Sequence, residues 1–326
     1  PLLTRAMALT ARPGRDVYGT VILGLLHWHD FQPDAALLAQ AHRLLDGAAL
    51  DGLSRLRVMM EIARREGDEA VQDAALPALD AWLSAAPRDR EGLCLDDAGG
   101  YRIETLFHLL PLLGWAARRT GEARYRDEAD RQLFGYQDWL EEPVTGLWHS
   151  AYGRGAHPYR ATPGFWGLGH GYLLAGLVDL IDQTGGNVDE ICLLRDLVKP
   201  LHAWMPVWGG WPQLIDRNTT FRCVAATGLL TYGFARAVLG AWIKPAYYAA
   251  SWGGMYHLGT LIAPDGRYGA ASQPTGGLDA PEEYLDHRCV NDDYALGMLL
   301  SGCAAQGACD AADVGTWGVD TRLGAR

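Results

Sequence analysis

The chain has almost no lysine and is short of positive charge overall. Lys199 and Lys244 are its only lysines, and the formal net charge is −11. An acidic chain without a basic stripe does not suit nucleic acid or an anionic membrane surface, so we expect neither as a partner. No run of about eighteen apolar residues occurs, which argues against a transmembrane helix.

Several catalytic and metal-binding signatures are also missing. The six cysteines form no Cys-x-x-Cys pair and have no histidines at zinc-site spacing. Neither a Gly-x-Ser-x-Gly elbow nor a His-Glu-x-x-His helix is present. The glycines after Trp166 lack the strand–helix–strand context of a phosphate-binding loop. The sequence therefore implies no metal and no organic cofactor.

Three features favour a secreted protein. The even number of cysteines permits up to three disulfides with fifteen possible pairings, although isolated buried thiols are the alternative. Asn218-Thr219-Thr220 fits the acceptor triplet for N-glycosylation. Because the chain begins with Pro1 rather than Met, we expect a signal peptide to have been removed or to lie outside this sequence.

What the chain has in abundance is apolar and aromatic side chains. Of its 326 residues 49% are hydrophobic, with 12 Trp and 14 Tyr. These rings can stack on the apolar faces of sugars or fill a core, and composition alone favours neither. No Ser/Pro-rich linker or charged block marks a boundary, so we expect a single domain spanning residues 1–326.

Helical periodicity dominates the sequence, with apolar residues at three- and four-residue intervals. It predicts helices over residues 17–29, 50–65, 70–85, 102–119, 125–140, 166–183, 190–204, 224–238 and 292–304. Extended segments are short and few, such as 146–149 and 210–215. The fold class is therefore all-α.

An internal repeat refines this prediction. Residues 63–70 are echoed 54 residues later by 117–124, and more faintly by 182–187. In each copy a helix stops at glycine and a polar turn leads into the next helix, so the repeat is one helical hairpin. Six such hairpins closing into a ring give an (α/α)6 barrel. An open helical solenoid is the alternative, but the long, uneven loops favour a barrel with an active site at one end.

Two carboxylates near helix starts are the main catalytic candidates. Glu104 lies among apolar residues in 101–115, where a carboxylate is costly to bury unless it is paired, protonated or used in chemistry. Asp51 opens an earlier helix, where an N-cap role is the simplest interpretation. Function and structural pairing are equally plausible for Glu104. Two such acids facing one cavity are typical of sugar-cleaving enzymes.

Further candidates lie in the middle of the chain. Thr145-Gly146-Leu147-Trp148-His149-Ser150 reads as a turn followed by an extended segment. The segment 165–172, Phe-Trp-Gly-Leu-Gly-His-Gly-Tyr, opens the next helix through glycines and aromatic rings, which we interpret as poor for packing and suited to sugar binding. Lone histidines such as His149 and His170 are more often structural than catalytic.

At these residues the chain resembles the unsaturated rhamnogalacturonyl hydrolases of glycoside hydrolase family 105 and, more distantly, the unsaturated glucuronyl hydrolases of family 88. Leu50-Asp51, followed by Gly67, matches the first carboxylate of the family and the turn after its helix. The family sequence Trp-x-Asp-x-Leu-Tyr-Met, leading to a Pro, is in register with residues 102–108, which places Glu104 on the proposed acid/base Asp. Thr-Gly-Leu at 145–147, Phe-Trp at 165–166 and Asn-Asp at 291–292 also match.

The chain departs from the family at several of these positions. The Arg of Phe-Trp-Ala-Arg-x-x-Gly-Trp is Leu168 here, and its final Trp is Tyr172. The family His after Thr-Gly-Leu falls on Ser150, beside His149. Those family positions help hold the unsaturated sugar, so their loss bears on substrate choice. Arg102, in place of the family Trp, can supply a compensating positive charge.

The resemblance implies a monomeric enzyme that releases a terminal Δ4,5-unsaturated uronic acid from lyase-generated oligosaccharides of the pectin or rhamnogalacturonan type. It does so by hydrating the C4=C5 enol ether, and apolar neighbours of Glu104 would keep that acid protonated. The resemblance implies catalytic roles for Glu104 and Asp51. It assigns substrate binding to Arg102, His149, Ser150, Trp166, His170 and Tyr172.

Three other functions remain compatible with the sequence. An inverting glycosidase would use Asp51 and Glu104 as base and acid, with carboxyl groups ~6.5–9.5 Å apart. A sugar epimerase on a helical barrel would use a histidine pair, for which His149 and His170 are available. A non-catalytic carbohydrate-binding barrel would bind ligand without turnover.

Overall fold

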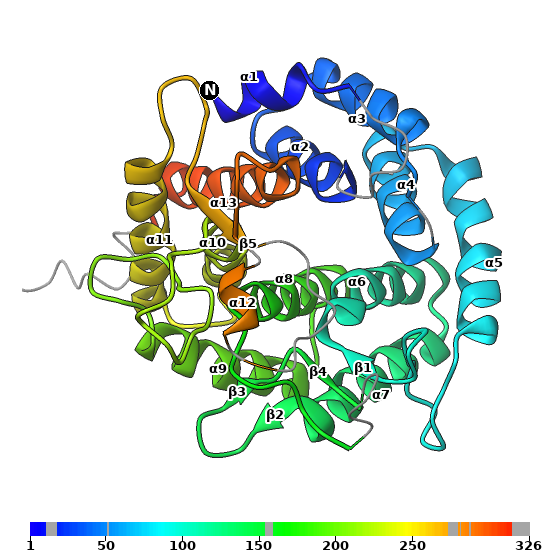
Figure 1. Cartoon of the computed structure of the whole chain (residues 1–326). Coiled ribbons are helices and arrows are strands. Elements are labelled where there is room, and N and C mark those ends of the chain that lie inside the picture. Colours follow the sequence, from blue (N-terminus) through cyan, green and yellow to red (C-terminus); the bar gives the residue numbers. More distant parts are fainter. Residues whose placement is uncertain are drawn as a thin grey trace, which may run out of the picture.

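Six helices form a closed ring at the centre of the protein (Figure 1). The computed structural model describes residues 1–10, 18–50, 52–153, 159–272, 280, 282–286 and 288–314. Within these residues the ring consists of α2 (Tyr18–Phe31), α4 (Gly52–Glu66), α6 (Ile103–Thr120), α8 (Gly167–Thr184), α10 (Val224–Leu239) and α13 (Asp293–Ala311). Each helix packs against the next, and α13 packs against both α10 and α2, which closes the ring.

An outer layer of helices surrounds the ring. It consists of α1 (Leu2–Met7), α3 (Ala35–Gly47), α5 (Glu69–Ala85), α7 (Ala123–Leu140), α9 (Val188–Ala203) and α11 (Tyr248–Leu261). The (α/α)6 prediction is thus confirmed, with one difference: the sixth pair is not a hairpin. The outer helix beside α13 is α1, from the other end of the described chain, which packs against α13 and α2.

The repeated glycine turns lie where inner helices end. Gly67, Gly121 and Gly185 follow α4, α6 and α8 with φ of 69°, 71° and 81°, the left-handed conformation that glycine adopts without strain. The outer helix then starts at a capping residue. Asp68, for example, accepts a hydrogen bond from the backbone N–H of Val71 at 3.0 Å. The three copies therefore mark the same inner-to-outer turn of successive pairs.

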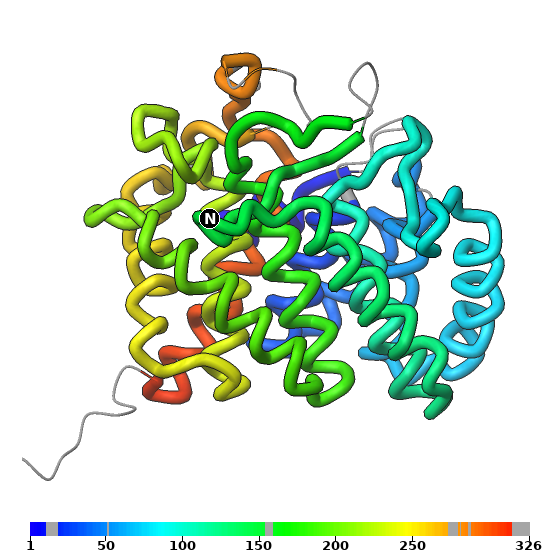
Figure 2. Tube along the Cα trace, turned by 90° about the horizontal axis from the view of Figure 1, so that it is seen from below, coloured from blue at the N-terminus to red at the C-terminus, as the bar shows by residue number. Residues whose placement is uncertain are grey.

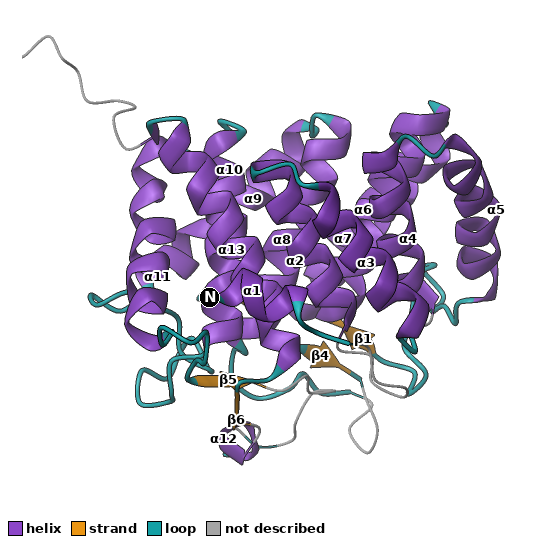
Figure 3. Cartoon of the chain, turned by 90° about the horizontal axis from the view of Figure 1, so that it is seen from above, coloured by secondary structure: helices purple, strands orange, loops and turns teal. Residues whose placement is uncertain are grey.

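These turns and the long loops lie at opposite ends of the barrel. All six inner helices begin at the end that carries the long loops, whereas the inner-to-outer turns at the other end are short (Figure 2). The strand pairs lie at the loop end (Figure 3). They are β1 (Tyr101–Arg102) with β4 (Ala151–Tyr152), β2 (Glu141–Glu142) with β3 (Leu147–Trp148), and β5 (Ala270–Ser272) with β6 (Arg288–Val290). The short elements η1 (Pro245–Tyr247) and α12 (Glu283–Asp286) complete the described chain.

Every expected helical range overlaps an observed helix, but three outer helices, α1, α3 and α11, were not predicted. The start of α3 carries a capping signal that was overlooked, since Asp34 accepts a hydrogen bond from the N–H of Ala36 at 2.8 Å. The α11 sequence mixes glycines with aromatic residues and leaves Trp252 and Tyr256 exposed, so no apolar stripe marks it. Of the expected extended segments, 146–149 contains β3, whereas 210–215 forms only isolated bridges.

Glycines allow the inner helices to approach one another closely. A Cβ on Gly297 of α13 would lie 2.0 Å from the carbonyl oxygen of Thr20 in α2. In the segment 165–172 a Cβ on Gly167 would lie 2.5 Å from the oxygen of Pro212. Such contacts leave no room for a side chain. The interpretation of this segment as poor packing material is therefore wrong, because its glycines are packing positions.

The cysteines are all free thiols. Cys94, Cys223 and Cys309 are buried, and Cys192 is exposed. Of the two alternatives, isolated thiols are the ones observed. Secretion therefore gains no support from disulfides and stays a prediction. Among the described helices, none has the length and apolar character needed to span a bilayer.

Candidate active site

A cavity of about 570 Å³ opens at the end of the barrel where the inner helices begin. This volume is typical of sites for small molecules. The first turns of α2, α4, α6, α8 and α13 contribute to its wall, together with α5 and the loop before β1. Its lining residues are Thr20, Gly52, Leu53, Ser54, Trp82, Asp96, Arg102, Glu104, Thr105, Phe107, His108, Tyr172 and Tyr294.

Glu104 lines this cavity from the first turn of α6. Its side chain is 17% exposed and forms an ion pair with Arg102, whose Nη2 donates to Oε2. Arg102 is held by the pairing of β1 with β4, opposite Ala151. The structural pairing considered for Glu104 is thus present. The expectation that apolar neighbours keep this acid protonated did not include the ion pair, and it stays a prediction.

A second carboxylate reaches the same cavity from the loop before β1. Asp96 lines the wall, and its Oδ1 accepts hydrogen bonds from the N–H groups of Ala98 and Gly100, each at 3.0 Å. This turn fixes the carboxylate relative to β1. Asp96 was not among the predicted site residues, although the run Asp96-Asp97-Ala98-Gly99-Gly100 is a turn signal. Asp51 lies outside the described residues, but the next three residues, 52–54, line the cavity.

His108 is the most unusual lining residue. It follows Glu104 by four positions on α6, so the two side chains share one face of the helix. Burial, together with the positive charge of Arg57, lowers the pKa of His108 to about 3. The imidazole is therefore neutral at any physiological pH. The four-residue spacing of Glu104 and His108 is visible in the sequence, but His108 was not among the predicted site residues.

Tyr172 is the only predicted sugar-binding residue besides Arg102 among the described lining residues. Its ring packs against Phe107 and Trp166, with centroids 5.0 and 6.0 Å apart. Its hydroxyl is buried and has no hydrogen-bond partner among the described residues. The family Arg position is occupied by Leu168. This side chain is fully buried and apolar, so it cannot form an ion pair or a hydrogen bond with a ligand.

The other predicted binding residues are not among the described residues that line this cavity. The Ser150 Oγ is within 2.9 Å of Thr162 Oγ1 and 3.0 Å of the Tyr284 hydroxyl. The Nδ1 of His149 is 2.7 Å from the Thr162 carbonyl oxygen, and the Nε1 of Trp166 donates to Ser272 Oγ at 3.0 Å. His149, Ser150 and Trp166 are thus hydrogen-bonded to residues of other segments of the chain. Contact of these three residues with the substrate stays a prediction.

His170 is a structural residue. It is fully buried, outside the described cavity lining, with both ring nitrogens bonded to backbone. Nε2 accepts from the N–H of Trp148 at 2.9 Å, and Nδ1 is 2.8 Å from the carbonyl oxygen of Trp166. Burial lowers the pKa of His170 to about 4, which keeps the ring neutral. Through these two hydrogen bonds, His170 connects β3 with the start of α8.

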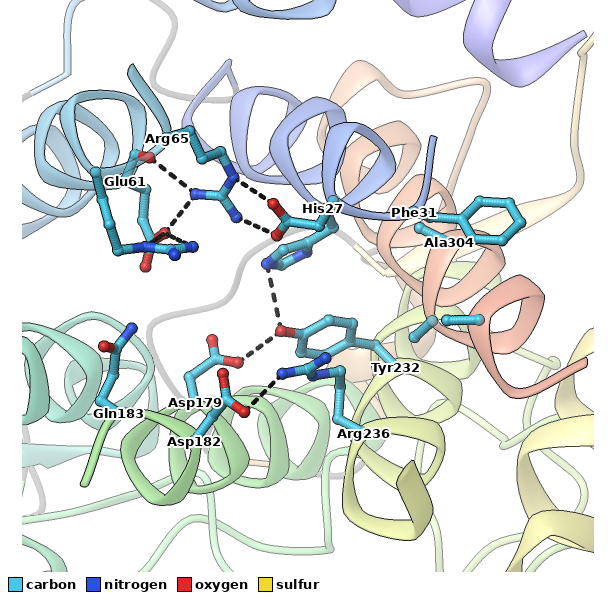
Figure 4. A pocket seen from close by; sticks show the side chains of 14 residues that line it. His27, Phe31, Glu61, Arg65, Asp179, Asp182, Gln183, Tyr232, Arg236 and Ala304 are labelled. Atoms are coloured by element: carbon cyan, nitrogen blue, oxygen red, sulfur yellow. Dashed lines mark hydrogen bonds and ion pairs between the residues drawn. The ribbon is translucent and has the colours of Figure 1, made fainter. Parts of the chain in front are cut away.

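A smaller pocket of about 110 Å³ lies at the opposite end of the barrel, among the last turns of the inner helices (Figure 4). There Arg65 lies between two carboxylates, with nitrogen–oxygen distances of 2.5 Å to both Glu61 and Asp30. Burial alone would raise the pKa of Glu61, but Arg65, Arg64 and Arg57 together lower it to about 2. This carboxylate is therefore ionised and paired.

A second chain of polar contacts crosses the same pocket (Figure 4). The Tyr232 hydroxyl donates to Asp179 at 2.6 Å and lies 3.3 Å from Nε2 of His27. The His27 Nδ1 lies 2.9 Å from Ser301 Oγ. Burial lowers the pKa of His27 well below its ordinary value. The charges of this pocket are paired within it, which gives this end of the barrel a structural role.

Arg57 connects the two ends. It is 1% exposed, and its Nη2 lies 2.5 Å from Asp179. Its Nη1 donates to the carbonyl oxygen of Phe107, and its guanidinium lies 4.3 Å from the centre of the Phe107 ring. Phe107 and His108 line the large cavity. The buried Arg57–Asp179 pair thus fixes the backbone of α6 one turn after Glu104.

Comparisons with known proteins agree with this architecture. A family model, Glycosyl Hydrolase Family 88, matches residues 30–303. Among curated proteins, the unsaturated rhamnogalacturonyl hydrolase YesR of Bacillus subtilis (strain 168) is 22% identical over 210 residues. That match covers 59% of this chain, which spans 58% of the relative's length.

Solved structures share the fold at low identity. A family 105 glycoside hydrolase from C. acetobutylicum has a TM-score of 0.81 at 15% identity, covering 94% of this chain and 98% of that one. A possible GH105 member from Klebsiella pneumoniae has 0.78 at 17%, covering 90% and 82%. An unsaturated glucuronyl hydrolase from Bacillus sp. GL1 has 0.67 at 15%, covering 89% and 84%.

Proposed function

Because the chain belongs to Glycosyl Hydrolase Family 88, we propose that it releases a terminal Δ4,5-unsaturated uronic acid from lyase-generated oligosaccharides of the pectin or rhamnogalacturonan type. The observation that carries this proposal is the Glu104 carboxylate in a cavity of about 570 Å³ at the open end of the barrel. The similarity to an unsaturated rhamnogalacturonyl hydrolase supports the choice of substrate.

In the proposed reaction Glu104 gives a proton to C4 of the enol ether, and water adds to C5. The carboxylate of Glu104 then takes the surplus proton from that water, so the acid is restored. The product carries a hydroxyl and the ring oxygen on C5, a hemiketal that opens to a ketone. Opening leaves C1 with a hydroxyl and the departing sugar, and this hemiacetal collapses to an aldehyde and releases the remaining oligosaccharide.

The Arg102–Glu104 ion pair suggests how the acid becomes protonated. A neighbouring guanidinium favours the charged form of a carboxyl group, and Arg102 is paired with Glu104. A uronate carboxylate entering the cavity would compete for the guanidinium and free Glu104 to bind a proton. Arg102 would then bind the substrate carboxylate, in place of the family Arg that is Leu168 here. Asp96 would act as a second acid or orient sugar hydroxyls.

The test is the loss of the ultraviolet absorbance of the C4=C5 bond conjugated with the carboxylate. Unsaturated rhamnogalacturonan, glucuronan and glycosaminoglycan disaccharides would be compared for wild type, Glu104→Gln and Glu69→Gln, the last on the exposed start of α5. We expect decay with the first substrate, lowered at least about a hundredfold by Glu104→Gln and unchanged by Glu69→Gln.

Two outcomes would contradict the proposal in different ways. Near-normal rates in Glu104→Gln would remove this residue from the chemistry. Absence of decay with every disaccharide, in folded wild-type protein, would leave a glycosidase of saturated sugars or a non-catalytic binding barrel. The epimerase alternative has lost its basis in the structure, because His170 is fully buried and bonded to backbone through both nitrogens.

A further inference from the structure

Burial lowers the pKa of four described histidines, His27, His108, His170 and His257, and the ring nitrogens of only the first and third have hydrogen-bond partners there. His27 is bonded to Ser301 and Tyr232, and His170 to the backbone of Trp148 and Trp166. The His108 side chain makes no hydrogen bond within the described part of the chain, and unlike His257 it lines the large cavity. A proton on the buried Nδ1 would have no acceptor within the described residues, which bears on where the neutral ring carries its hydrogen.

The two nitrogens of His108 face different surroundings. Nδ1 is buried and without a partner, whereas Nε2 is not among the buried atoms and the residue lines the large cavity. Nε2 is therefore the atom open to a ligand. The guanidinium of Arg57, bonded to the carbonyl oxygen of the preceding residue Phe107, places a positive charge near the ring.

These surroundings decide which nitrogen carries the single proton of the neutral ring. A proton on Nδ1 would be buried without an acceptor. A proton on Nε2 leaves only a lone pair on the buried Nδ1 and presents an N–H donor to the cavity. His108 thus offers a neutral donor one helical turn from the Glu104 carboxylate.

We propose that His108 donates its Nε2 hydrogen to a hydroxyl of the unsaturated sugar and so positions that sugar beside Glu104. A sugar hydroxyl can accept from His108 and at the same time donate to Glu104 or Asp96, which only accept when ionised. The family sequence in register with residues 102–108 has Met at this place, so the donor is a property of this chain. The inference rests on the proposed function and adds a specificity-determining residue to it.

The experiment compares His108→Met, which removes the donor, with His108→Gln, whose amide nitrogen can replace Nε2. With the disaccharide that wild type degrades, we expect His108→Met to raise KM about tenfold, the effect of one lost hydrogen bond, with kcat within about threefold. His108→Gln should recover KM to within about threefold. The Kd of the same disaccharide, measured by calorimetry in a Glu104→Gln background, should change in parallel.

A deoxy series identifies the hydroxyl. For one monodeoxy disaccharide, wild type and His108→Met should have the same KM, because the partner is already gone. An unchanged KM in His108→Met, or an equal loss in His108→Met and His108→Gln, overturns the inference while the proposed function stands. Absence of turnover by wild type overturns the proposed function and this inference with it.

Discussion

Replacing His170 should make the protein less sensitive to acid. Burial lowers the pKa of His170 from its ordinary value of 6.5 to about 4 in the folded protein. Below about pH 6.5 the unfolded chain therefore binds a proton at this ring that the folded chain does not bind. The stability linked to His170 is fully present above pH 6.5 and is lost as the pH falls towards 4. His170→Gln retains an acceptor and a donor at this place but cannot titrate.

The size of the effect follows from these two values. Between about pH 7.5 and about pH 5, linkage gives a loss of about 2 kcal/mol in the free energy of unfolding from this one ring. The ring is fully buried, so no correction for solvent screening applies. His27 and His108 add to the acid sensitivity of wild type and of the variant equally, so the difference between the two proteins isolates His170.

The assay is urea unfolding of both proteins at about pH 7.5 and about pH 5, followed by tryptophan fluorescence. His170→Gln should be less stable than wild type at the higher pH because its hydrogen bonds to Trp148 and Trp166 are less well aligned. Between the two pH values it should lose about 2 kcal/mol less than wild type. Equal losses in the two proteins would show that His170 is accessible to protons when folded, and the structural role given to it would be wrong.

Two further substitutions test the interior of the barrel. Arg57→Met leaves the Asp179 carboxylate buried without its cation and should lower the free energy of unfolding by about 3–5 kcal/mol, with part recovered in Arg57→Met/Asp179→Asn. Wild-type stability in the single variant, by the same urea assay, would contradict this. Gly297→Ala places a methyl group 2.0 Å from the Thr20 oxygen and should lower the melting temperature by several degrees, since overpacking costs about 1–3 kcal/mol. Gly259→Ala on α11, with nothing near its Cβ, is the matched control and should be neutral or stabilising; similar losses in both would refute the close-packing argument.

Most of the fold could be predicted from local patterns in the sequence. The 54-residue spacing of the glycine turns identified the inner-to-outer turn, because left-handed glycine after a helix is a local requirement. The closure of the ring could not be predicted in the same way. It depends on α1 and α13, which lie far apart in the sequence and meet only through tertiary packing. For α11, packing on one flank leaves Trp252 and Tyr256 exposed, and periodicity fails.

The site was predictable where it follows the helix pattern and not where it depends on loops. Glu104 stood out as a carboxylate in an apolar helix, and the structure places it in the cavity. Asp96 comes from a loop, whose path no periodicity describes. His170 was grouped with the binding residues by its glycine-rich surroundings, but the backbone groups of Trp148 and Trp166 that occupy its ring become neighbours only in the folded protein.

The common direction of the inner helices has an electrostatic consequence. Each helix carries a partial positive charge at its first turn and a partial negative charge at its last, and within the described residues the beginnings of five inner helices, α2, α4, α6, α8 and α13, line the large cavity. At the far end, where the inner helices finish, Arg64, Arg65 and Arg236 are paired with carboxylates. In a chain with a net charge of −11, these helix beginnings and Arg102 are the described features of the cavity that would attract an anionic sugar. Capture of such a sugar should weaken as salt screens this attraction.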